Sequence, residues 1–251
     1  MSVENGEWIM HGLDFDDPGC IRTVDDLEDY IEEVGFVPLF GNGIRGFSVE
    51  EHTDPRFWWT DDEKRDPWKW REIIARRGKI AYGKFFDKKA GFISLRWLPY
   101  FANYRRDGYD FDARWEDGLI NRREKTIMDL LTDTDEDGDM IWPDKRILST
   151  ELKKMAGFGK TGAKNYPGTI TNLQMQTYLV IRDFVRRTNK RGEEYGMPVS
   201  ILQPPETIWG YETVTSAYNE SPSDSRQKII DHIQKICVDP DEFDIIKLVG
   251  K

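Results

Sequence analysis

The sequence of 251 residues is poor in the side chains that build zinc, redox and disulfide sites. Its two cysteines, Cys20 and Cys237, lie far apart and form no CxxC motif, and its three histidines are scattered. Zinc sites use cysteine and histidine ligands at short spacings, so no zinc site is expected. Free thiols are typical of a reducing compartment, and we expect a cytoplasmic protein that needs no cofactor.

Long apolar runs are also missing. No stretch approaches the roughly 18 apolar residues of a membrane span, and an acidic N-terminus without an apolar signal-peptide core predicts no membrane partner. No Gly-x-Ser-x-Gly motif of a hydrolase nucleophile is present. The segment Gly157-Phe-Gly-Lys-Thr-Gly resembles the end of a P-loop, but Lys154 stands where the first glycine is needed. The sequence therefore predicts no nucleotide cofactor.

Charge is distributed unevenly along the chain. The net charge of −10 argues against a general nucleic-acid-binding protein. However, residues 1–66 contain 18 acidic and 5 basic residues, whereas residues 145–191 contain 11 basic and 2 acidic residues. This asymmetry is typical of a polyanion-binding surface on an acidic body. It is also compatible with a basic module that docks on the acidic part of its own chain.

The pattern of caps and apolar residues predicts an α+β fold. We expect it to be mostly helical, with two short β-hairpins and a winged-helix-like module in the C-terminal half. Helices are predicted at 24–34 after Thr23, at 68–77 after Asp66-Pro67, at 121–131, and from Ser221 to Cys237. The expected divisions are an irregular lead-in (1–22), an N-terminal α+β part with an aromatic cluster and a hairpin (23–118), a winged-helix module (119–203) and a C-terminal helical segment (204–251).

The winged-helix prediction rests on residues 149–203. A short helix at 149–156 precedes a second helix at 169–180, which leads into hairpin strands at about 181–188 and 197–202. The turn Asn189-Lys-Arg-Gly192 places glycine where a left-handed residue is needed. These elements correspond to a support helix, a recognition helix and a two-stranded wing.

A winged helix with this charge predicts DNA as the partner. The recognition helix would lie in the major groove with Asn172, Gln176 and Thr171 near base edges. Its apolar face predicts that Ile170, Leu173 and Val180 are buried. The basic side chains that would contact phosphates are Lys153, Lys154, Lys160, Lys164, Arg182, Arg186, Arg187, Lys190 and Arg191.

Two further segments have two interpretations each. Residues 57–70 contain four of the nine tryptophans, which would either stack on bases or form core. Asp133, Asp135 and Asp137, with Gly138 next, follow the front half of a calcium-binding loop. Asp144 stands at position twelve in place of glutamate, and the second interpretation of residues 132–144 is an acidic linker.

Several segments resemble the AlkZ-related family, a bacterial group without an assigned function. They are Trp68-Lys-Trp-Arg-Glu-Ile-Ile-Ala-Arg, Ile80-Ala-Tyr-Gly-Lys-Phe-Phe-Asp, Asn103-Tyr-Arg-Arg-Asp-Gly-Tyr-Asp-Phe-Asp and Leu173-Gln-Met-Gln-Thr-Tyr-Leu-Val. The parent AlkZ/YcaQ family comprises winged-helix DNA glycosylases that excise alkylated bases and unhook interstrand crosslinks. Those enzymes use a Gln-apolar-Gln or Gln-apolar-Asp motif to position a water at the sugar carbon.

The resemblance implies that Gln174 and Gln176 are catalytic. In a helix that advances about 100° per residue, however, side chains two residues apart point roughly 200° apart. Only an extended or kinked backbone would bring these two amides to one water. Three hypotheses follow: a DNA-binding protein linked to repair of alkylated or crosslinked DNA, a monofunctional DNA glycosylase, and a winged-helix module for protein contacts.

Overall fold

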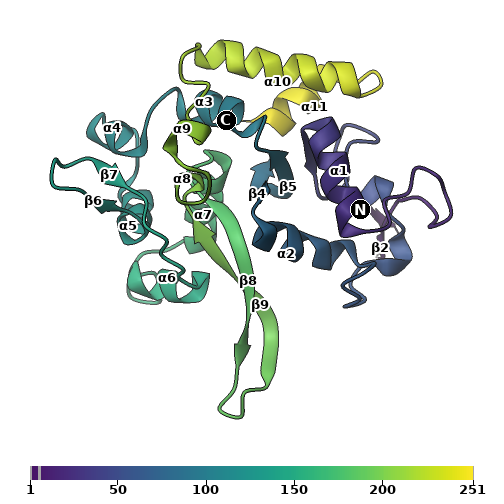
Figure 1. The fold of residues 1–251 in the computed structure, drawn as a ribbon, viewed down its shortest axis with the longest axis horizontal. Helices are drawn as coiled ribbons and strands as arrows, with labels where there is room; N and C mark the ends of the chain where they lie inside the picture. Colours follow the sequence, from purple (N-terminus) through teal and green to yellow (C-terminus); the bar gives the residue numbers. More distant parts are fainter. Residues whose placement is uncertain (1, 5–6, 251) are drawn as a thin grey trace.

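The computed structural model describes residues 2–4 and 7–250, and it confirms the α+β class (Figure 1). The helices are α1 (Val24–Val34), α2 (Pro67–Arg77), α3 (Leu98–Arg106), α4 (Phe111–Glu116), α5 (Arg122–Leu131), α6 (Ser149–Met155), α7 (Tyr166–Met175), α8 (Pro205–Trp209), α9 (Tyr211–Val214), α10 (Pro222–Ile236) and α11 (Glu242–Val249), with 3-10 turns at Glu50–His52 and Pro55–Phe57. The strands are β1 (Ser2–Glu4), β2 (Glu7–Ile9), β3 (Phe36–Pro38), β4 (Ile80–Phe86), β5 (Lys89–Ser94), β6 (Asp133–Thr134), β7 (Met140–Ile141), β8 (Val180–Thr188) and β9 (Glu194–Gln203).

Local capping signals set the ends of several helices where the sequence predicts them. The side chain of Thr23 accepts a hydrogen bond from the backbone of Asp26 in a capping box at the start of α1. Asp66 caps α2, and Gly78 ends it in the left-handed conformation. Such caps satisfy backbone groups that a helix leaves unpaired at its ends. None of the described helices is both long and apolar enough to cross a membrane.

The strands form small antiparallel sheets of two or three strands. Strands β3, β5 and β4 form a three-stranded sheet in that order. Strands β8 and β9 form a long hairpin, which projects from the rest of the molecule in Figure 1. Gly192 in its turn has a φ of 81°, so the predicted requirement for glycine is confirmed. The lead-in is not wholly irregular, because β1 pairs with β2.

Two hydrophobic cores organise the described part of the chain. The first lies under the three-stranded sheet and includes residues from α1, α2 and α3, together with Ile229, Ile233 and Leu248 from α10 and α11. The second joins α4, α5, α6, α7 and the base of the β8–β9 hairpin. Residues 204–251 therefore complete the core of the N-terminal part rather than packing by themselves. Ile170, Leu173 and Val180 are buried, as predicted.

Helix α7 is shorter and earlier than the predicted helix at 169–180. It begins at Tyr166 and ends at Met175, and β8 starts at Val180. The backbone amide of Thr177 donates to Gln174 O, and that of Tyr178 donates to Leu173 O. This is the Schellman arrangement that ends helices, with Thr177 at a φ of 62° in the position that glycine usually occupies. The prediction placed the end too late because the helical spacing of apolar residues continues to Val180, whereas the backbone leaves the helix at Thr177.

Candidate nucleic-acid interface

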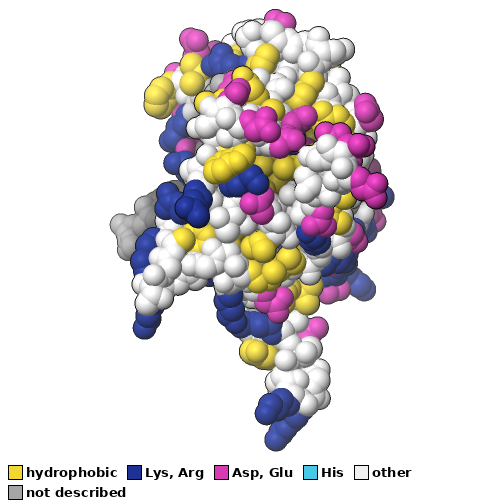
Figure 2. Space-filling view, turned by 90° about the vertical axis from the view of Figure 1, so that its left-hand side faces the viewer, with side chains coloured by type: hydrophobic (Ala, Val, Ile, Leu, Met, Phe, Trp, Pro, Cys, Tyr) yellow, Lys and Arg dark blue, Asp and Glu magenta, His cyan; other side chains and the backbone are white. Residues whose placement is uncertain are grey.

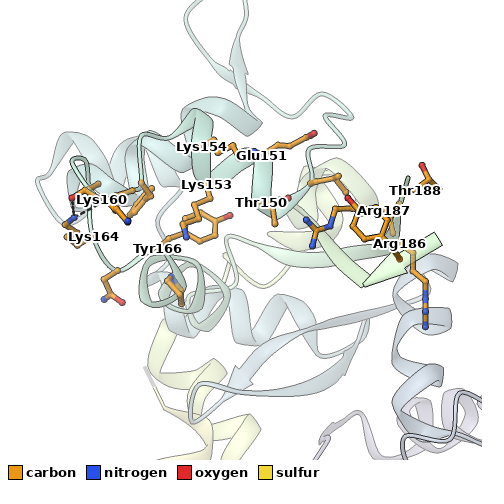
Figure 3. Close-up of a pocket in the computed structure, with 18 residues that line it drawn as sticks. Thr150, Glu151, Lys153, Lys154, Lys160, Lys164, Tyr166, Arg186, Arg187 and Thr188 are labelled. Atoms are coloured by element: carbon orange, nitrogen blue, oxygen red, sulfur yellow. Dashed lines mark hydrogen bonds between the residues drawn. The ribbon is translucent and has the colours of Figure 1, made fainter. Parts of the chain in front are cut away.

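A wide groove lies between α6, the loop 157–165, the first turn of α7 and one face of the β8–β9 hairpin. Its volume is about 1140 Å³. Six of its side chains are basic, namely Lys153, Lys154, Lys160, Lys164, Arg186 and Arg187, and one is acidic, Glu151. Figure 3 shows that the labelled side chains come from α6, the following loop and the start of α7 on one side of the groove and from β8 on the other. We call it the basic groove.

The sequence places these residues through three local features. Lys153 and Lys154 occupy the exposed last turn of α6, whose Leu152 is buried. Asn165 adopts the left-handed conformation and caps α7, and this turns the basic loop back toward α6. The hydroxyl of Tyr166 donates to Ser149 O at 2.8 Å, which ties the start of α7 to the start of α6. Burial raises the pKa of the Tyr166 phenol, so this hydroxyl stays a donor at neutral pH.

The basic groove faces outward rather than toward the acidic N-terminal region. Of the eleven basic residues in 145–191, Arg186 alone pairs with a described carboxylate from residues 1–66. Its Nη2 lies 3.4 Å from Asp61 Oδ1. Among the residues that the structure describes, Lys153 and Lys154 have no ion pair. Figure 2 shows Lys and Arg side chains on the lower part of one face and at the end of the projecting hairpin. Docking of the basic segment on the acidic N-terminal residues of the same chain therefore neutralises few of its basic side chains.

The other predicted phosphate-binding residues lie elsewhere. Lys190 and Arg191 are exposed at the tip of the hairpin, beyond the groove. Arg182 points to a different element, because its Nη1 donates to Ala75 O at 2.8 Å and to Arg76 O at 2.7 Å at the end of α2. Arg182 thus caps a helix within the protein.

Helix α7 presents few side chains for base contacts. Thr171 is buried at 8% exposure, and Asn172 is exposed but does not line the basic groove. The parts of α7 that line it belong to its first turn, Tyr166 and Pro167, with the capping Asn165. The groove is therefore built mainly from cationic side chains that suit phosphates, with few of the amides that read base edges.

The Gln174 side chain of the catalytic hypothesis is buried and hydrogen-bonded within the protein. Gln174 is 2% exposed; its Oε1 accepts from Lys84 N at 2.9 Å and its Nε2 donates to Ile170 O at 3.3 Å. Gln176 follows the last residue of α7 as its C-cap. The Gln174 side chain lies so close to strand β4 that residue 83 must be glycine, since a Cβ there would lie 3.1 Å from Gln174 Oε1. Gln174 joins α7 to β4 rather than opening to solvent.

Among the described residues, the carboxylates of the acidic stretch at 132–144 do not gather into a metal-binding group. Strands β6 and β7 make a hairpin across it. Asp135 accepts from the backbone of Asp137 and Asp139, and Asp133 pairs with Lys145 at 2.7 Å. No group of three or more acidic, histidine or cysteine side chains that could hold a metal occurs in the described residues. Backbone amides and Lys145 thus contact two of the three aspartates of the predicted loop, Asp135 and Asp133.

The tryptophans of residues 57–70 are mainly core. Trp58 and Trp70 are buried, while Trp59 is 51% exposed. The guanidinium of Arg71 lies between two rings, 3.7 Å from the Trp68 ring centroid and 4.3 Å from that of Phe184. This cluster thus joins α2 to β8.

Several groove residues lie outside the charge pattern and were not predicted. Thr150, Thr188, Tyr166 and Tyr195 line the groove with hydroxyl groups or rings, and the Arg187 guanidinium lies 5.5 Å from the Tyr195 ring centroid. Charge alone cannot identify such residues. A strand register that paired Arg187 with Tyr195 would have identified one of them.

Comparison with known proteins gives one family. A family model described as AlkZ related matches residues 21–250. No curated protein and no solved structure matches the chain significantly.

Proposed function

The chain belongs to the AlkZ-related family, and from this premise we propose that it binds DNA through the basic groove, in a role linked to repair of alkylated or crosslinked DNA. The observation that carries the proposal is the convergence of six cationic side chains and one carboxylate on a single groove of about 1140 Å³. Arginine and lysine bind phosphate oxygens, and this non-specific term supplies much of the affinity for DNA. The groove therefore suits the sugar–phosphate backbone.

The order of elements supports a winged-helix interpretation. Helices α5, α6 and α7 are followed by the β8–β9 hairpin, and Leu148 forms an isolated bridge with Ile201 on β9. That bridge puts the residue before α6 beside the wing, so α6, the start of α7 and the hairpin form one surface. In this proposal the hairpin tip, with Lys190 and Arg191, extends the contact along the backbone.

Binding of this kind is largely independent of sequence. Thr171 is buried and Asn172 lies outside the groove, so few side chains can reach base edges. Contacts to phosphates position a protein on a duplex without reading its sequence. We therefore expect similar dissociation constants for unrelated duplexes of equal length.

The test removes one cation from each wall of the groove. We expect Lys153→Ala/Arg187→Ala to weaken binding to two unrelated duplexes equally and to lower the slope of log K against log salt by about 2. Fluorescence anisotropy across a salt series measures both quantities.

A matched control is Lys79→Ala/Lys235→Ala, which removes two exposed lysines outside the groove. Equal losses in the two double variants would contradict the proposed interface. A strong preference for one duplex would contradict backbone recognition.

The glycosylase hypothesis gains no support from Gln174 and Gln176. Both polar atoms of the Gln174 side chain hydrogen-bond within the protein, and its amide is buried. A pair that positions a water needs two polar groups within hydrogen-bond reach of it. We therefore assign Gln174 a structural role.

A further inference from the structure

A second, smaller cleft lies next to the basic groove, between the β8–β9 hairpin and α2. Its volume is about 380 Å³, which falls within the range of about 300–1,000 Å³ typical of small-molecule sites. Lys69 and Glu72 from α2 and Asp183 and Phe184 from β8 line it. We call it the polar cleft.

Three charged residues of the polar cleft are largely buried. Lys69 and Glu72 are each 9% exposed, and Asp183 is 8% exposed. Lys69 Nζ lies 2.8 Å from Asp61 Oδ1, and Asp183 Oδ1 lies 3.0 Å from Arg76 Nε. Burying charge is costly unless each charge is paired, so these side chains are held in place by their partners.

The two buried carboxylates keep hydrogen-bonding capacity for a ligand. Glu72 Oε1 accepts from Arg71 Nη2 at 3.2 Å, but Glu72 Oε2 has no hydrogen-bond partner among the described residues. Asp183 Oδ2 has a single long contact, 4.0 Å from Arg146 Nη1. A carboxylate accepts at both oxygens, so the cleft offers acceptors to a ligand that carries N–H donors.

Acidic side chains outnumber basic ones in the polar cleft, whereas basic side chains dominate in the basic groove. Four carboxylates and three cations line the cleft, whereas one carboxylate and six cations line the groove. The two sites share Val185 and Arg186 on β8. Phosphates bound in the groove can therefore extend to Arg186, while the carboxylates beyond it repel them. A neutral or cationic ring attached to such a backbone is not repelled.

A strained loop closes one side of the polar cleft. Asp61 contacts both Lys69 and Arg186, and so it bridges α2 and β8. Trp59 and Asp61 each have a φ of 61°, and the buried carboxylate of Asp66 accepts both of their backbone amides at 3.1 Å. The hydrogen bond from Lys69 holds the pKa of Asp61 below its ordinary value. Strained backbone fixed in this way is typical of preorganised sites.

We propose that the polar cleft binds a single unpaired nucleobase of the DNA held in the basic groove. Glu72 and Asp183 accept hydrogen bonds from amino or imino N–H groups on the base edge, as acidic side chains accept from base amino groups elsewhere. The Phe184 ring, braced by Arg71, supplies an aromatic surface beside the base. This inference rests on the proposed function, because the groove delivers the strand.

The experiment compares two duplexes of the same sequence, one fully paired and one with a single bulged adenine. An already unpaired base saves the cost of unpairing, so we expect the wild-type protein to bind the bulged duplex about tenfold more tightly. We expect Glu72→Ala, which removes the acceptor, to abolish this preference and to keep the affinity for the paired duplex. Lys153→Ala/Arg187→Ala should weaken both duplexes and keep the preference.

The possible results separate the two proposals. Equal affinity of the wild-type protein for both duplexes, which needs no variant, would overturn the polar-cleft inference and leave DNA binding standing. A preference that persists in both Glu72→Ala and Asp183→Ala, each checked for native circular dichroism, would also overturn it. Failure to bind either duplex at low salt would overturn the proposed function and this inference together.

Discussion

Arg106 joins three segments at the junction of the two cores. Its side chain is 1% exposed; Nη1 lies 2.5 Å from Glu206 Oε1 and Nη2 donates to Thr177 O at 2.7 Å. Burial by itself would lower the pKa of Arg106, but the carboxylate of Glu206 outweighs it and the pKa is raised. The bond to Thr177 O also holds the left-handed turn that ends α7. A buried charge pair thus sets where the helix stops and the wing begins.

Removing the charge of Glu206 should therefore destabilise the whole fold. Glu206→Gln keeps the shape but leaves Arg106 buried without a counter-charge, and we expect a loss of about 3 kcal/mol in the free energy of unfolding. Urea unfolding measures it. Glu212→Gln on the neighbouring helix α9 is the exposed control, and similar values for the two variants would show that the buried pair contributes little.

Cys237 gives a prediction that depends on pH. Burial, with a smaller effect of Glu51, raises the pKa of this thiol to about 11. The thiolate is the reactive form, so alkylation in Cys20→Ser, which leaves this one thiol, should rise about tenfold per pH unit from pH 8 to pH 10. Iodoacetamide kinetics followed by mass spectrometry test this. A rate that levels off as pH approaches 10 would mean an unshifted thiol.

At the scale of elements, the basic groove exists because four segments with different conformations meet. Helix α6 and the loop 157–165 supply lysines, and β8 supplies Arg186 and Arg187. The shift in register between Val185 and Arg187 is part of this arrangement, because a bulge changes the side to which strand residues point. Arg182 belongs to the same strand, yet it caps α2. Arg182 therefore has a structural role, whereas Arg186 and Arg187, further along β8, line the basic groove.

At the scale of the whole molecule, the chain crosses between the two cores more than once. Residues 21–102 and 208–249 contribute to the first core, and residues 111–179 contribute to the second. Strand β8 touches both, since Val180 packs in the first core and Ile181 packs against both. The basic groove and the polar cleft therefore both lie along one hairpin that is anchored in both cores.

The C-terminal segment should consequently control the stability of the N-terminal part. Ile233 on α10 is fully buried in the first core, and we expect Ile233→Ala to lower the free energy of unfolding by about 3 kcal/mol. Ile246→Ala on α11, where the side chain is 45% exposed, should stay within about 1 kcal/mol of wild type. Eight of the nine tryptophans precede residue 204, so their fluorescence reports the coupling. An unchanged tryptophan transition in Ile233→Ala would mean that residues 204–251 fold separately.

Features that depend on neighbours along the chain could be predicted from the sequence. Thr23, Asp66 and Asn121 cap their helices because a side-chain oxygen reaches backbone amides two or three residues away. Gly192 marks the hairpin turn because its φ is positive. The basic bias of residues 145–191 likewise indicated a surface for a polyanion, and six of those side chains line one groove.

The end of α7, the pairing of the acidic stretch and the position of the polar cleft could not be predicted from the sequence. Thr177 reverses the chain although it is not glycine, because Arg106 and the Schellman hydrogen bonds hold it there. Asp133 pairs with Lys145 instead of joining a metal site. Glu72 and Asp183 are 111 residues apart in the sequence and meet in one cleft only when β8 packs against α2. Local spacing cannot show such contacts, since they depend on which elements share a core.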